Sequence, residues 1–161
     1  MKGDSIIYNF PISPNIFVYD LTTKKQVKFE INSNHSRVKT SPITIKKFND
    51  PKKRITYAWT EAQFFPIKWD STRSLFYRMY KKYTPLVTDG QEVTNYGTAK
   101  QFFLTILDED FRVVNEIELP GYLLPEFVIG KDGLYFQLKH DFRENENSLD
   151  FYVLGLEDLI S

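Results

Sequence analysis

"FFLTILDEDFRVVNEIELPG", residues 102–121, reads as a strand, a polar turn and a second strand. An apolar run extends from Phe102 to Leu107, and apolar residues return after the turn at Val113, Val114, Ile117 and Leu119. Two runs rich in β-branched and aromatic residues around a polar turn predict an antiparallel hairpin. The turn holds three carboxylates, Asp108, Glu109 and Asp110. They suit a metal site, a catalytic cluster or only a turn.

The spacing of the carboxylates distinguishes a metal site from a turn. Calcium loops place carboxylates at alternate positions and add further oxygen ligands and usually a glycine. Asp108 and Asp110 alternate, but Phe111, Arg112 and Val113 follow them. Aspartate also favours turns, because its side chain accepts hydrogen bonds from nearby backbone N–H groups. A second hairpin at residues 15–31 carries Asp20 at the matching place, so the sequence predicts a turn.

Similar hairpins recur along the chain. "FPIKWDSTRSLFYRMY" from Phe65 and "PEFVIGKDGLYFQLKH" from Pro125 share a strand, a polar turn and an aromatic strand. Each is followed by a strand or hairpin of the first kind, so the repeating unit has four strands, with roughly sixty residues between equivalent points. We therefore predict an all-β chain of antiparallel four-stranded meanders. These would form a partial β-propeller of about two and a half to three blades. Residues 41–59 are predicted to add a hairpin that turns at Asn49-Asp50-Pro51.

Length and composition limit the possible functions. The 161 residues fit a single domain, and we expect one partial propeller domain over residues 1–161. The 21 basic and 21 acidic residues balance, so there is no net field to hold a phosphate backbone, and nucleic acid is not an expected partner. The chain has no cysteine, hence no disulfide or thiolate nucleophile. No apolar run reaches the eighteen or so residues that a membrane span requires.

Three stretches carry a family resemblance: residues 64–80, residues 102–121 and "PEFVIGKDGLYFQLKHDFRENENSLDFYVLGLEDL" from Pro125. In this order they resemble the C-terminal part of an uncharacterised family of six-bladed β-propeller-like (TolB-like) proteins, usually predicted lipoproteins of gut bacteria. The resemblance implies that the chain is the C-terminal half of a larger propeller in the periplasm or cell envelope. No signal segment or lipobox cysteine is present in this chain, so a cytoplasmic location stays open. The family brings no catalytic residues and no cofactor.

Other polar motifs are weaker. His140 and Asp141 could be a base and its orienting partner, but adjacent residues of an extended chain point to opposite sides. His35 lies in a polar loop, far in sequence from His140, and two such histidines make a weak metal site. The basic pairs of residues 46–54 could meet an acidic partner, although a charged surface hairpin that protects a sheet edge explains them adequately. We predict no catalytic and no metal-ligating residue.

Aromatic residues provide the candidate ligand site. Aromatic rings can stack on the apolar faces of sugars or peptides, although in repeated strands they more often form core. We select Trp59, Trp69, Tyr77 and Tyr80.

Two function classes follow from these residues. The first is a non-enzymatic binding or scaffold module for an unknown protein, peptide or glycan. The alternative is an envelope hydrolase that acts on glycans and combines carboxylates such as Glu61, Asp70 and Asp108. Because a partial ring would expose apolar blade faces, we also expect self-association as a homo-oligomer.

Overall fold

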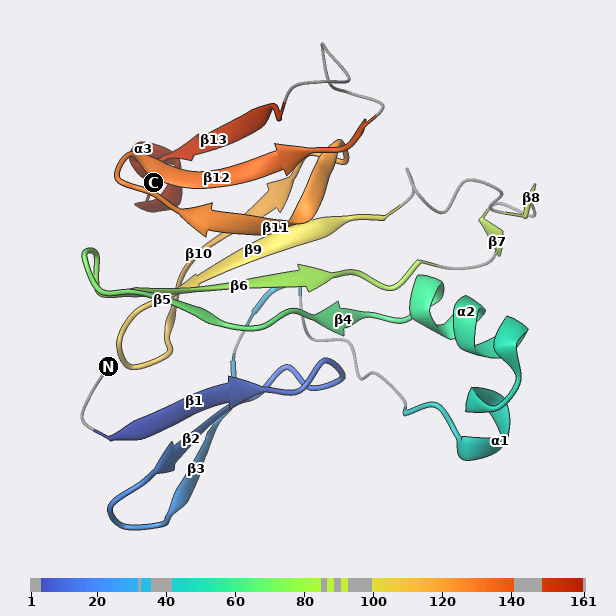
Figure 1. Cartoon of the computed structure of the whole chain (residues 1–161), viewed down its shortest axis with the longest axis horizontal. Helices are drawn as coiled ribbons and strands as arrows, with labels where there is room; N and C mark the ends of the chain where they lie inside the picture. Colours follow the sequence, from blue (N-terminus) through green and yellow to red (C-terminus); the bar gives the residue numbers. More distant parts are fainter. Residues whose placement is uncertain are drawn as a thin grey trace.

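The computed structural model describes residues 4–31, 33–35, 42–84, 87–88, 91–92, 100–140 and 149–160. Three antiparallel sheets, which we call the N-terminal, central and C-terminal sheets, follow one another along the chain (Figure 1). The N-terminal sheet contains β1 (Ser5–Asn9), β2 (Ile16–Asp20) and β3 (Gln26–Phe29). The C-terminal sheet contains β11 (Leu123–Ile129), β12 (Gly133–Leu138) and β13 (Phe151–Gly155), and α3 (Leu156–Ile160) follows it. The predicted all-β class and antiparallel pairing are confirmed.

The central sheet has the order β10 (Val113–Leu119), β9 (Phe102–Leu107), β6 (Leu75–Lys81), with β4 (Gln63–Phe64) and β5 (Lys68–Asp70) both paired to β6. β4 pairs with the end of β6 and β5 with its beginning, so together they act as one interrupted edge strand. Pro66 lies in the interruption, and proline has no N–H to give to a ladder. With β4 and β5 counted as one strand, this sheet is the predicted four-stranded meander, whereas the N-terminal and C-terminal sheets have three strands each and not the predicted four. A short ladder of β7 (Val87–Thr88) and β8 (Gln91–Glu92) stands apart.

β6 is buried on both faces because the central sheet lies between the other two (Figure 1). Alternation along the strand sends Tyr77 towards the C-terminal sheet and Phe76 and Arg78 towards the N-terminal sheet. The guanidinium of Arg78 donates from Nη1 to the carbonyl of Pro14 at 2.7 Å and lies 4.8 Å from the centre of the Phe64 ring. Burial lowers the pKa of Arg78 to about 10. The aromatic strand predicted in this hairpin is confirmed.

The hydrophobic core has two parts, one at each interface between neighbouring sheets, and we call these interfaces joints. Between the N-terminal and central sheets lie Ile16, Ile31, Phe76, Leu107 and Phe111. The larger cluster, between the central and C-terminal sheets, includes Tyr77, Met79, Leu104, Ile106, Leu123, Phe127, Leu134, Phe136 and Leu154. The outer faces of the two end sheets remain apolar and exposed, for example at Ile6 in β1 and at Val128 and Val153 in the C-terminal sheet.

The hairpin predicted for residues 41–59 is wrong, because α1 (Ile45–Phe48) and α2 (Pro51–Thr60) occupy this part of the chain. Asp50 and Pro51 suggested a turn, but the same pair is also a favoured helix start. The Asp50 carboxylate accepts hydrogen bonds from the backbone N–H groups of Lys52 and Lys53 at 3.0 and 3.2 Å. Proline at the first helical position gives up an N–H that a helix leaves unpaired in any case. Local capping therefore outweighs the alternation of β-branched residues.

Three hairpin turns at one end of the molecule share an aspartate (Figure 1). Asp20, Asp70 and Asp108 each accept hydrogen bonds from backbone N–H groups two to four residues further on. Each turn also has a residue with positive φ: Lys24 at 58°, Ser74 at 55° and Phe111 at 60°. The prediction that the acidic cluster forms a turn is confirmed.

Candidate functional site

A pocket of about 240 Å³ opens between the N-terminal and central sheets, at the end where the aspartate turns lie. Strands of both sheets and the turn between β9 and β10 contribute to its wall. The lining residues are Ser5, Ile7, Val18, Phe29, Trp69, Phe76, Glu109, Asp110 and Phe111. The wall is therefore largely apolar, with carboxylates only on the turn.

Four aromatic rings form a continuous wall. The Trp69 ring lies 4.4 Å from Phe76, Phe76 lies 4.9 Å from Phe111, and Phe111 lies 4.7 Å from Phe29, between ring centres. These separations suit tilted or offset aromatic packing, which fixes the rings in place. The pocket therefore presents flat aromatic faces.

Phe111 reaches the pocket through an unusual backbone conformation. Its φ of 60° is rare for a bulky side chain. The Asp108 side chain holds the turn by accepting hydrogen bonds from the N–H groups of Asp110 and Arg112, both at 2.9 Å. The N–H of Phe111 donates to the Asp108 carbonyl at 3.0 Å. The acidic turn thus serves the site by placing an aromatic ring.

The rim of the pocket is acidic. Glu109 and Asp110 are both exposed, and Asp110 pairs with Arg112 at 3.3 Å in an ion pair open to water. Within the described part of the chain, Glu109 has no ion-pair partner. Aromatic faces and a carboxylate together suit a cation that is attached to an apolar group.

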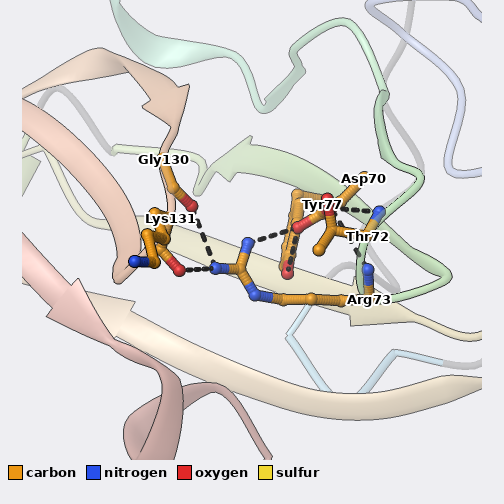
Figure 2. Close-up of polar contacts among 6 residues, drawn as sticks. All are labelled: Asp70, Thr72, Arg73, Tyr77, Gly130 and Lys131. Atoms are coloured by element: carbon orange, nitrogen blue, oxygen red, sulfur yellow. Dashed lines mark hydrogen bonds and ion pairs between the residues drawn. The ribbon is translucent and has the colours of Figure 1, made fainter.

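The other face of the β5–β6 hairpin carries a polar network, which Figure 2 shows. Nη1 of Arg73 donates to Oδ2 of Asp70 at 2.5 Å, and Nη2 of Arg73 donates to the carbonyls of Gly130 and Lys131 at 2.9 and 2.5 Å. The Tyr77 hydroxyl donates to the same Asp70 carboxylate at 3.4 Å. One arginine therefore connects the central sheet to the turn between β11 and β12.

Burial and hydrogen bonding shift the pKa values of this network. Burial opposes the charge of Asp70, but hydrogen bonds from Arg73 and from the N–H of Thr72 outweigh it and lower the pKa of the carboxyl. Burial, reinforced by the Asp70 charge, raises the pKa of Tyr77 to about 12. Asp70 is consequently an ionised carboxylate whose hydrogen bonds hold the β5–β6 turn and Arg73 in place.

Of the four aromatic residues predicted to bind a ligand, only Trp69 lines this pocket. Tyr77 and Tyr80 are fully buried and lie on opposite faces of β6, whereas Trp59 lies on α2 and is 44% exposed. The four rings are not brought to one cleft. Phe29, Phe76 and Phe111 were missed, although the position of Phe111 directly after the acidic turn was a signal in the sequence.

The other polar residues considered in the sequence lie in different parts of the fold. Asp70 and Asp108 cap different turns, and Glu61 follows the last residue of α2, so nothing favours the hydrolase alternative. His35 stacks on Phe103 at 4.3 Å between ring centres, and Asp141 lies outside the described residues. In the described ranges, no three His, Cys, Asp or Glu side chains are grouped as metal ligands. No helix there is long and apolar enough to cross a membrane.

Known proteins resemble the chain in sequence family and in fold. A family model described as "Domain of unknown function (DUF4221)" matches residues 1–118, whereas the resemblance seen in the sequence lay largely in the last hundred residues. A crystal structure of a DUF4221 family member from Bacteroides vulgatus superposes with a TM-score of 0.70 at 18% sequence identity. The match covers 96% of this chain and 43% of that protein, so the chain spans less than half of that relative's length. No curated protein matches the sequence.

Proposed function

The chain belongs to the DUF4221 family, and we propose that it is a non-enzymatic β-propeller-type binding module of the bacterial cell envelope. The observation that carries the proposal is the aromatic pocket with an acidic rim between two stacked sheets. In this proposal each of the three sheets is a blade. The central sheet is buried on both faces at β6. Ligand sites commonly lie where such elements meet.

The three blades are part of a larger propeller. Closed propellers have about four to eight blades, and the apolar outer faces of the two end sheets are suitable packing surfaces for further blades. The solved relative, of which this chain covers 43%, contains enough additional sequence to supply them. A second copy of the chain could supply them equally, as in the expected homo-oligomer. Light scattering on the isolated chain tests this, and a monomer that resists association at micromolar concentration would contradict self-association.

The ligand is a protein or peptide that inserts one side chain. At about 240 Å³, the pocket is smaller than the 300 Å³ or more of typical small-molecule sites, but it has room for one long side chain. The aromatic wall packs on the aliphatic stem of a lysine or arginine, and Glu109 at the rim pairs with its cation. A glycan that stacks on Trp69 is the competing ligand.

A screen with two chemistries distinguishes these ligands. The isolated chain is tested on a random heptapeptide library and on a glycan array, and hits are measured by calorimetry. We expect peptides with lysine or arginine to be enriched and their affinity to fall at least tenfold in Trp69→Ala. The matched control is Trp59→Ala, which removes the other tryptophan and should leave the affinity unchanged.

Three outcomes would count against the proposal. Equal loss in both tryptophan variants would place binding outside the pocket. Enrichment of glycans alone would contradict the peptide ligand, and no hit at millimolar ligand would contradict the binding function. The envelope location is tested by fractionating cells that express the full gene, where recovery in the cytosol would refute it.

A further inference from the structure

We propose that α1 and α2 form a surface that docks on an anionic phospholipid membrane. This helix-pair surface consists of four exposed apolar residues, Ile45, Phe48, Ile55 and Trp59, and three basic residues, Lys46, Lys52 and Arg54. Lys47 and Lys53 are also exposed but lie beside Thr56, Tyr57 and Thr60. The inference does not depend on the pocket, because the two features share no residue.

The apolar part of the surface points away from the protein. In α2, Thr56, Tyr57 and Thr60 lie on the protein side, where Thr60 is buried. Ile55 and Trp59 lie one turn apart on the other side and are 50% and 44% exposed. A helix of a soluble domain normally turns its large apolar residues inward, so this outward stripe calls for a covering partner.

α1 extends the same surface. Ile45 and Phe48, one turn apart, are 81% and 50% exposed. The Arg54 guanidinium lies 5.4 Å from the centre of the Phe48 ring, which joins the two helices at the surface. Both helices therefore contribute apolar side chains bordered by cations.

The charge of the helix pair is strongly positive, although the chain as a whole is neutral. All five basic side chains are exposed. The acidic residue between them, Asp50, caps α2 and pairs with Lys53 at 3.4 Å. Lys100 adds a cation 5.8 Å from the centre of the Trp59 ring. The positive charge is thus local and is attached to the apolar stripe.

A lipid surface fits this combination better than an acidic protein or a nucleic acid. Tryptophan prefers the boundary between lipid headgroups and acyl chains, and isoleucine and phenylalanine insert just below it. Lysine and arginine extend their charged ends to anionic headgroups while their stems remain in contact with apolar neighbours. A nucleic acid backbone would use the cations but leave the apolar stripe in water.

The placement of the helices is compatible with the pocket. α1 and α2 lie at the end of the molecule opposite the aspartate turns (Figure 1). Since the turn of residues 108–111 lines the pocket, docking through the helices leaves the pocket end directed away from the membrane.

Vesicle binding tests the proposal. The chain is mixed with vesicles of phosphatidylcholine containing 30% phosphatidylglycerol, and with pure phosphatidylcholine vesicles, and binding is measured by co-sedimentation and tryptophan emission. We expect at least tenfold stronger partitioning to the anionic vesicles, a blue shift of the emission, and loss of binding in 0.5 M NaCl. The blue shift should disappear in Trp59→Phe.

Two double variants separate the two parts of the surface. Ile45→Ser with Ile55→Ser, and Lys46→Glu with Lys52→Glu, should each lower partitioning at least tenfold. The control, Lys25→Glu with Lys131→Glu, makes the same charge change at exposed positions on the hairpin turns and should bind like the wild type. Circular dichroism verifies that each variant is folded.

Each other outcome overturns the inference. Binding to vesicles that survives the serine substitutions would depend on charge alone. A surface of that kind would suit an acidic protein and would not require a membrane. Equal loss in the control would show a response to total charge. Absence of binding to the anionic vesicles at low salt would refute the membrane surface outright.

Discussion

The two joints of the sheet stack differ at the end where the aspartate turns lie. Between the central and C-terminal sheets, Arg73 reaches two carbonyls of the β11–β12 turn, and Lys68 donates to the carbonyl of Phe127 at 2.5 Å. Between the N-terminal and central sheets, the same end holds a pocket of about 240 Å³. Both arrangements are built on the two faces of one hairpin, β5–β6.

This difference shows how neighbouring joints can divide structural and binding roles. At the closed joint, polar side chains bind the backbone of the adjacent sheet, and a large apolar cluster fills the space. At the open joint, contacts gather away from the pocket, where the backbone N–H of Phe64 donates to Pro11 and the Asn9 side chain bonds to Phe65 and Ile67. The open joint can therefore hold a ligand while other contacts keep the sheets together.

The largest expected effect is the loss of Arg73 at the closed joint. Arg73→Ala leaves the Asp70 carboxylate, which is 2% exposed, without its charged partner, and should lower the free energy of unfolding by about 3 to 5 kcal/mol. Urea denaturation measures this change. Adding Asp70→Asn, which keeps an acceptor for the turn, should recover part of the loss. A loss below about 1 kcal/mol, the range of surface ion pairs, would show that the joint does not depend on this pair.

Acid should remove part of the same stabilisation. The pKa of Asp70 in the folded protein lies below its ordinary value of 3.8, so its contribution is complete above that pH and is lost as the pH falls through the folded value. Wild-type protein should therefore lose more stability than Asp70→Asn between pH 5 and pH 2. Parallel melting curves of the two proteins over this range would contradict the role of Asp70.

Enlarged side chains should distinguish the filled joint from the open one. Leu134 is fully buried in the closed joint, and Leu134→Phe should cost about 1 to 3 kcal/mol through overpacking. Val18 lines the pocket, so Val18→Phe should cost less than about 1 kcal/mol because the new ring has room. Denaturant unfolding of both variants gives the comparison, and equal costs would mean that the pocket is not open space.

The turn that places Phe111 should contribute less. Asp108→Ala removes the acceptor for the N–H groups of Asp110 and Arg112, at a cost of about 0.5 to 2 kcal/mol in unfolding free energy. Calcium should not change the melting temperature of the wild type. A rise with calcium that disappears in the variant would instead assign a metal to the turn.

The smallest effects are expected for two tyrosine hydroxyls on opposite faces of β6. Tyr77→Phe removes the hydrogen bond to Asp70 at the closed joint and should cost about 0.5 to 1.5 kcal/mol. The buried Tyr80 hydroxyl has no hydrogen-bond partner in the described structure, so Tyr80→Phe should be neutral or slightly stabilising. Thermal melts provide the test, and the reverse order would contradict the assignment of the two faces.

Part of the candidate site could be predicted from the sequence. The acidic turn was correctly predicted because Asp20 and Asp108 recur at the same place in similar hairpins. The sequence could not show that Trp59 and Trp69 lie apart, since Trp59 lies on a helix in a segment predicted as a hairpin. The positive φ of Phe111 has no signature in the residue itself, because bulky residues rarely adopt it.

Outside residues 41–59, the sequence by itself determined the antiparallel hairpins, their turns and the meander order of the central sheet. These features depend on alternation and turn residues, which act between neighbours along the chain. Only the tertiary structure decided that β6 is buried on both faces, that Arg73 crosses to the C-terminal sheet and that four aromatic rings surround a pocket. Such features join residues far apart in sequence, and their energies depend on how whole sheets pack. Periodicity shows which face of a strand is apolar, but not which sheet covers it.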